Sequence, residues 1–102
     1  MTNKKTVAEC RAYLIRSVDE AKAVAKSWLD DLLLGQVTTF GLPEVDDRYH
    51  VWRVPVKGEA SLLKVGEIVI DAFSGDVDAK KTTRPSLIEA RLLKKDEEAL
   101  KA

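Results

Sequence analysis

The sequence predicts an α+β domain in which an N-terminal helix packs on a small antiparallel β-sheet and a C-terminal helix follows. Three observations predict this fold. Residues 18–34 place apolar side chains three or four positions apart, the period of an amphipathic helix. Residues 49–56 and 63–73 alternate apolar and polar side chains, as half-buried strands do. Residues 85–100 return to a helical period.

Length and composition limit the class of protein. A chain of 102 residues, 45% of them hydrophobic, supports one core but not two, so a single domain over residues 1–102 is expected. The 17 basic and 17 acidic residues balance, which removes any global attraction to nucleic acid or an anionic membrane. The single Cys10 cannot form an internal disulfide and is interpreted as a small buried hydrophobe. We find neither an export signal nor a membrane span, and we expect a cytoplasmic protein without a membrane partner.

The first helix is expected to begin after Ser17, because Ser17 and Glu20 form a capping box. Gly35 is expected to end this helix in the left-handed conformation. The apolar face consists of Val18, Ala21, Ala25, Trp28 and Leu32.

The same apolar stripe continues backward to Val7, where Thr6 and Glu9 offer a second capping box. One long helix from Val7, or a short helix followed by a break near Ser17, are both compatible with this pattern.

The middle of the chain predicts the strands of the sheet. Residues 36–40 are rich in β-branched side chains, and residues 44–48 form a polar connection. In the next strand, Pro55 cannot donate to a ladder, so this strand is expected at a sheet edge or bulged at Pro55. A turn with Gly75 at positive φ then leads into a last strand over residues 77–81.

Two faces of the sheet follow from the alternation. We expect Ile68 and Ile70 to form the core with Trp28 of the helix. In the C-terminal helix, Ser86 and Glu89 form a further capping box, with Pro85 just before the helix begins.

Three segments together resemble the PepSY family: SVDEAKAVAKSWLDDLL, YHVWRVPV and VGEIVIDAFSGDVDA. The resemblance covers residues 18–80, and the C-terminal helix over residues 85–100 lies outside it. It implies a cystatin-like layer of helix on antiparallel sheet without enzymatic activity. It also implies an inhibitory or regulatory module that contacts another protein.

The residues themselves indicate no enzyme, and no catalytic, cofactor-binding or metal-binding residue is predicted. The single histidine, His50, is expected on a strand face beside Trp52 as a partly buried structural imidazole. Asp71, Asp76 and Asp78 lack the spacing of a calcium loop. We expect Asp71 to accept turn amides and the other two to be solvated.

A basic stretch from Lys80 to Lys95 raises the question of nucleic-acid binding. Six positive residues stand there against Glu89. The stretch has no interleaved aromatic residues, and residues 96–98 that follow it are all acidic. Because both features are atypical of a nucleic-acid site, we expect a helix whose basic residues are solvated or dock on the acidic hairpin region over residues 59–78.

These observations favour a protein-binding module, such as an inhibitor, immunity factor or accessory subunit, acting through its sheet face or C-terminal helix. The partner would be another protein or a second copy of the chain. The candidate contact residues, on the sheet face opposite the main helix, are Tyr49, Val51, Arg53, Val69 and Phe73. The alternative is a small-molecule-binding domain with a pocket between helix and sheet.

Overall fold

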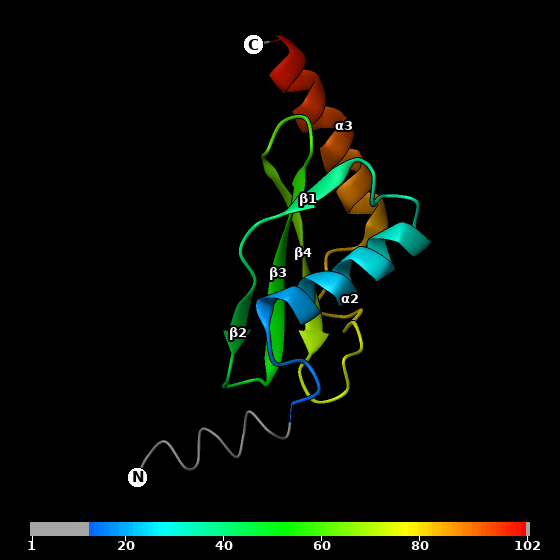
Figure 1. Cartoon of the computed structure of the whole chain (residues 1–102). Coiled ribbons are helices and arrows are strands. Elements are labelled where there is room, and N and C mark those ends of the chain that lie inside the picture. Colours follow the sequence, from blue (N-terminus) through cyan, green and yellow to red (C-terminus); the bar gives the residue numbers. More distant parts are fainter. Residues whose placement is uncertain (1–12, 102) are drawn as a thin grey trace.

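The computed structural model describes residues 13–101, with side chains described as far as Lys94. Helix α2 precedes a four-stranded sheet and helix α3 follows it (Figure 1), so the predicted α+β fold is confirmed. The elements are α2 (Val18–Asp31), β1 (Thr38–Phe40), β2 (Glu44–Asp46), β3 (Val51–Gly58), β4 (Lys64–Asp71) and α3 (Pro85–Lys101). Within the described residues, no helix is long and apolar enough to cross a membrane.

Strand β3 lies at the centre of the sheet, and all of its pairings are antiparallel. It pairs with β4 along one side, from Val51↔Asp71 to Lys57↔Lys64. Along its other side it pairs with β2 at one end and β1 at the other. Residues 44–46 were expected as part of a polar connection but form strand β2, because their backbone pairs with the part of β3 that β1 does not reach.

Pro55 lies in this central strand, so the expectation of an edge strand is wrong. The Pro55 carbonyl accepts from Gly41 N–H at 2.9 Å, in the gap between the end of β1 and the start of β2. The nitrogen and the carbonyl of a strand residue point to the same side, so the nitrogen of Pro55, which carries no hydrogen, also faces this gap. The proline therefore removes no hydrogen bond between paired strands. The expected irregularity is present nearby, as a register shift between Val56 and Lys57.

Helix α2 begins as predicted and ends earlier than predicted. Ser17 Oγ accepts from Glu20 N–H at 3.1 Å, which satisfies one free amide of the first turn. The helix ends at Asp31, and the left-handed residue is Leu33 with φ 62°, not Gly35. The early reversal turns Leu34 into the core, where it is 7% exposed.

Residues 13–17 before α2 are not helical, which excludes one long helix through Ser17. Instead, Leu14 and Ile15 donate their N–H groups to the carbonyl of Ala72, and Ile15 accepts from the Trp52 indole at 2.9 Å. This segment therefore closes one end of the sheet. The proposed helix at Val7, its Thr6–Glu9 cap and Cys10 lie outside the described residues.

The core lies between α2 and one face of the sheet. Ile68 and Ile70 are fully buried there, as predicted. Trp28 is only partly buried at the rim of the core, and Leu29 is the large side chain of α2 at its centre. The core residues of α2 are Ala21, Ala25 and Leu29, with Val18, Val24, Trp28 and Leu32 packed around them.

Helix α3 completes the same core. Gly66 alternates with Ile68 along β4 and so faces the core side, and a Cβ at Gly66 would lie 3.0 Å from Ile88 of α3. Ile88 and Leu92 are buried in the same cluster as Ile68. The helix begins at Pro85, one residue before the predicted Ser86 cap, and proline suits a first helical position because its N–H is not needed.

The outer edge of β4 is covered by residues 76–83 and not by a full strand. Only the bridge between Ile70 and Val77 remains of the predicted last strand. Beyond it, the Thr82 and Thr83 hydroxyls accept from the N–H groups of Val69 and Glu67. The preceding turn is confirmed, since Gly75 has φ 79°.

Candidate functional site

The sheet face opposite the helices does not carry the predicted exposed apolar strip. Val51 and Val69 lie on this face, but they are 3% and 0% exposed, so the chain itself covers them. Arg53, the cross-strand neighbour of Val69, is the half-buried charge at the centre of the face. Val51 and Val69 therefore cannot be direct contact residues in this structure.

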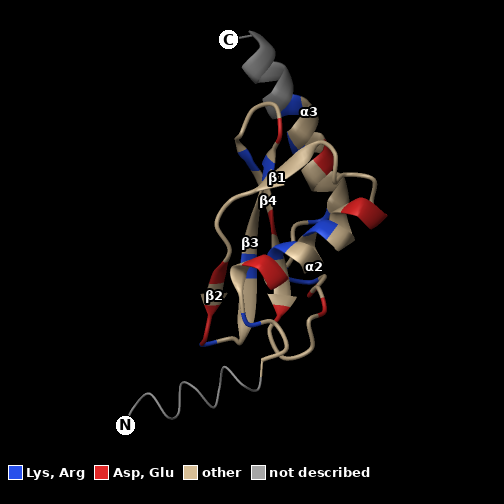
Figure 2. Cartoon of the chain, viewed as in Figure 1, with Lys and Arg blue, Asp and Glu red and all other residues tan. Residues whose placement is uncertain are grey.

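Acidic residues of β2 and β4 lie beside Arg53 on this open face. Figure 2 shows the acidic residues on β2. Arg53 lies 3.5 Å from the carboxylate of Asp46 and 3.8 Å from that of Glu67. Asp46 also accepts from the backbone N–H and the guanidinium of Arg48. Hydrogen bonds from Arg48 lower the pKa of Asp46, so this cluster is an ion-paired support for the β2–β3 hairpin.

Phe73 lies at one end of the sheet and not on the open face, because β4 ends at Asp71 and the chain turns. Its ring meets Tyr13 edge-on, with centroids 5.1 Å apart, and lies 4.8 Å from the ring of His50. Tyr13 is buried, whereas Phe73 remains 46% exposed. Phe73 is thus an exposed aromatic side chain held in place by a buried one.

His50 lies in the turn between β2 and β3, with φ 54°, so its predicted place on a strand face is wrong. Its Nδ1 is 2.8 Å from the hydroxyl of Tyr13, and that hydroxyl also donates to Asp47 at 3.2 Å. These contacts join the N-terminal segment to the hairpin turn. The imidazole is therefore a structural group, as the sequence predicted.

Tyr49 is 57% exposed in the same turn, between two cations. The guanidinium of Arg48 and the ammonium of Lys81 each lie 5.4 Å from the centre of its ring. Both distances allow cation–π attraction, which restrains the ring while leaving it accessible.

The segments that carry Leu14, Tyr49 and Phe73 lie at the same end of the sheet, which we call the aromatic end. The N–H of Ala72 donates to the carbonyl of His50, so the turns carrying Phe73 and Tyr49 lie together. Leu14 joins them, because its N–H also bonds to Ala72. The aromatic end consists of the exposed side chains of Leu14, Tyr49 and Phe73, and the half-buried His50 packs against Phe73 there.

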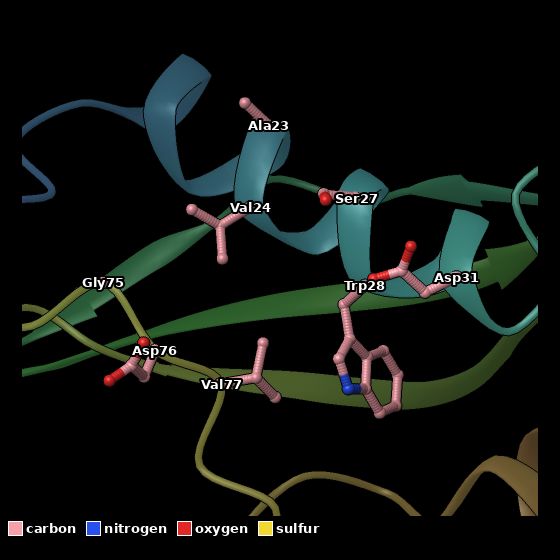
Figure 3. A pocket seen from close by; sticks show the side chains of 8 residues that line it. All are labelled: Ala23, Val24, Ser27, Trp28, Asp31, Gly75, Asp76 and Val77. Carbon is pink, nitrogen blue, oxygen red and sulfur yellow. The ribbon is translucent and has the colours of Figure 1, made fainter.

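A groove runs beside the aromatic end, between α2 and the chain that follows β4 (Figure 3). Its volume is about 460 Å³, and it is open to solvent. Val24 and Trp28 of α2 face Val77 across it, and Asp31 and Asp76 stand toward its two ends. The groove combines an apolar floor with two carboxylates.

The remaining acidic candidates serve the turns. Asp71 accepts from the N–H groups of Phe73 and Ser74 at 2.8 and 3.0 Å, as predicted. Asp78 is not merely solvated, since it accepts from the N–H of Lys80. Over the part of the chain that the structure describes, no group of three metal-ligating side chains comes together.

Sequence reasoning missed Tyr13 and Leu14 as parts of the site. Both precede the strong helical period of α2, where their pattern continues the helix stripe. The Ser17 cap was a weak indication of their position, because the residues before an N-cap lie outside the helix.

Comparison with family models, with curated proteins and with solved structures found no match to this chain. The structure itself defines a small α+β domain with helices packed on one face of an antiparallel sheet.

Proposed function

We propose that this chain is a non-enzymatic protein-binding module of an inhibitory, immunity or accessory type, and that it contacts its partner through the aromatic end. The single observation that carries this proposal is that Leu14, Tyr49 and Phe73, each about half exposed, lie on segments whose backbones are joined through Ala72. Tyr49 and Phe73 were both among the residues that the sequence selected.

The physical support comes from the way these side chains are held. Tyr49 is restrained by Arg48 and Lys81, and Phe73 by Tyr13 and His50. Aromatic side chains fixed before binding lose little conformational entropy in a complex. Aromatic and arginine side chains also dominate binding energy at interfaces, so Tyr49 and Phe73 are suited to be anchors.

The PepSY resemblance is part of the same proposal, because the order of helix and strands agrees with it. It supports a regulatory role without catalysis. A cytoplasmic site of action belongs to the proposal as well, supported by the single cysteine of the chain.

A small-molecule site is the second candidate, supported by the groove between α2 and residues 75–77. Small ligands usually bury most of their surface in an enclosed pocket. This groove is open, which favours a partner that brings its own surface.

The test compares capture of proteins from the native host by the intact chain and by the variant Tyr49→Ala/Phe73→Ala. A captured protein is then purified and titrated against both. Loss of two interface anchors should weaken binding by about thirtyfold or more. Leu87→Ala is the matched control, since Leu87 is 41% exposed on α3, and it should bind like the intact chain.

Sedimentation velocity of each variant shows whether the partner is a second copy. Circular dichroism confirms that each variant is folded. Equal affinity of the double variant and the intact chain for the captured protein would refute the aromatic end as the contact surface.

A further inference from the structure

The groove between α2 and the turn after β4 has an unbalanced charge. It is lined by Asp31 and Asp76 and by no basic side chain. Among the described residues, neither carboxylate takes part in an ion pair. The groove therefore presents two uncompensated negative charges around an apolar floor, and a positively charged occupant complements it.

Asp31 is placed unfavourably for the helix that carries it. It is the last residue of α2, whose last turn holds no basic residue. The carboxyl end of a helix carries partial negative charge, so a carboxylate there is repelled. A bound cation beside Asp31 would relieve this repulsion.

Trp28 lies in the same groove, one turn before Asp31 on α2, and its ring is partly exposed (Figure 3). The face of an indole attracts cations more strongly than that of any other side chain. A guanidinium also stacks flat on such a ring while its N–H groups reach a carboxylate. Trp28 and Asp31 are three residues apart on α2 and therefore neighbours on the surface of the helix, so one arginine side chain can reach both.

The groove continues into the aromatic end. A Cβ at Gly75, which lines the groove, would lie 3.0 Å from Leu14 of the aromatic end. A protein seated on the aromatic end can therefore extend a segment along the groove, whose open side accommodates a backbone.

We propose that this groove binds a basic peptide segment of the partner protein, with an arginine side chain stacked on Trp28 and paired with Asp31, and a second basic side chain near Asp76. The proposal rests on the proposed function, since it names the chemistry of that partner.

The test titrates the ¹⁵N-labelled full chain with the peptide acetyl-Arg-Leu-Arg-amide and follows the indole N–H signals by NMR. We expect the Trp28 signal to shift with saturation. The Trp52 signal is an internal control and should stay in place, because Trp52 is 7% exposed and bonded to the Ile15 carbonyl. The matched peptide replaces both arginines by citrulline, which keeps the shape and removes the charge.

The citrulline peptide should bind about tenfold more weakly than the arginine peptide, because it loses a cation–π contact and the exposed ion pairs. Asp31→Asn and Asp76→Asn should each weaken binding by about three- to fivefold. Glu89→Gln is the charge-matched control on the exposed side of α3 and should leave the affinity unchanged.

Equal binding of the citrulline peptide, or unchanged affinity in Asp31→Asn, would overturn the proposal. Binding of agmatine as tight as that of the peptide would assign the groove to a small guanidinium compound and overturn the proposal of a peptide segment. The variant Tyr49→Ala/Phe73→Ala keeps every side chain of the groove. Its affinity for the partner protein and its affinity for the peptide are therefore measured independently. Failure of the proposed function and failure of this inference are thereby distinguished.

Discussion

Gly75 offers a test of the turn that joins the groove to the aromatic end. Its φ of 79° lies in the left-handed region, where an L-residue is strained by about 1–2 kcal/mol. An alanine Cβ would also approach Leu14 Cδ2 to 3.0 Å. Leu14 is 58% exposed and flexible at that end, so it can move aside at small cost. We therefore expect Gly75→Ala to lower the free energy of unfolding by about 1–2 kcal/mol.

A series of substitutions separates backbone strain from lack of space. Asparagine tolerates the left-handed conformation, so Gly75→Asn should cost less than Gly75→Ala although its side chain is larger. Gly75→Val should cost the most, because a β-branched residue is a severe outlier there. Gly66 is the matched contrast, since its φ is not positive and its Cβ position lies 3.0 Å from the buried Ile88. At Gly66 the order should reverse, with asparagine worse than alanine.

Urea denaturation followed by circular dichroism measures each free energy of unfolding by linear extrapolation. An unchanged stability of Gly75→Ala would show that the positive φ does not exist in solution. A larger loss in Gly75→Asn than in Gly75→Ala would show that space, and not strain, limits this position.

Four further outcomes are expected. Ile70→Ala removes a fully buried side chain and should cost about 2–5 kcal/mol in the same assay, whereas a loss below about 1 kcal/mol would contradict the assignment of the sheet faces. Leu33→Gly should stabilise the chain by about 0.5–1 kcal/mol, since it relieves a positive φ at an exposed residue; destabilisation would speak against that conformation. Asp31→Asn should stabilise the free chain by about 0.3–1 kcal/mol in low salt while weakening the binding of the peptide. A variant less stable than the intact chain would argue against repulsion at the end of α2. Asp46 should titrate below 3.8 in an NMR pH series, because Arg48 stabilises its charged form. Its contribution to stability should be present above that pH and be lost as the pH falls through the lowered pKa; a midpoint at or above 3.8 would exclude the Arg48 contact in solution.

Local patterns determined much of the fold. The three- and four-residue spacing correctly placed Ala21 and Ala25 on the buried face of α2 but missed Leu29. The alternation along β3 and β4 correctly placed Ile68 and Ile70 in the core. Gly75 was identifiable because a turn of this kind requires a positive φ. In each case the physical cause lies within a few residues of the chain, so the sequence alone carries it.

Tertiary packing decided the end of α2. Gly35 is the better left-handed residue, yet Leu33 adopts that conformation because the chain must turn Leu34 into the core. Burial of a leucine contributes about 1.5–3 kcal/mol, more than the strain of about 1–2 kcal/mol at Leu33. A preference for glycine is therefore outweighed by a contact that local sequence does not reveal.

The candidate site depends on contacts between distant parts of the chain. Residues 13–15 reach Trp52 and Ala72, and this contact brings Tyr13 to both Phe73 and His50. The alternating pattern correctly placed Val51 on the open face, but it did not show that the chain buries it. The sequence by itself determined which residues share a face of each strand and which residue types could anchor a partner. Only the tertiary structure decided which of them remain exposed, because exposure depends on what other segments cover.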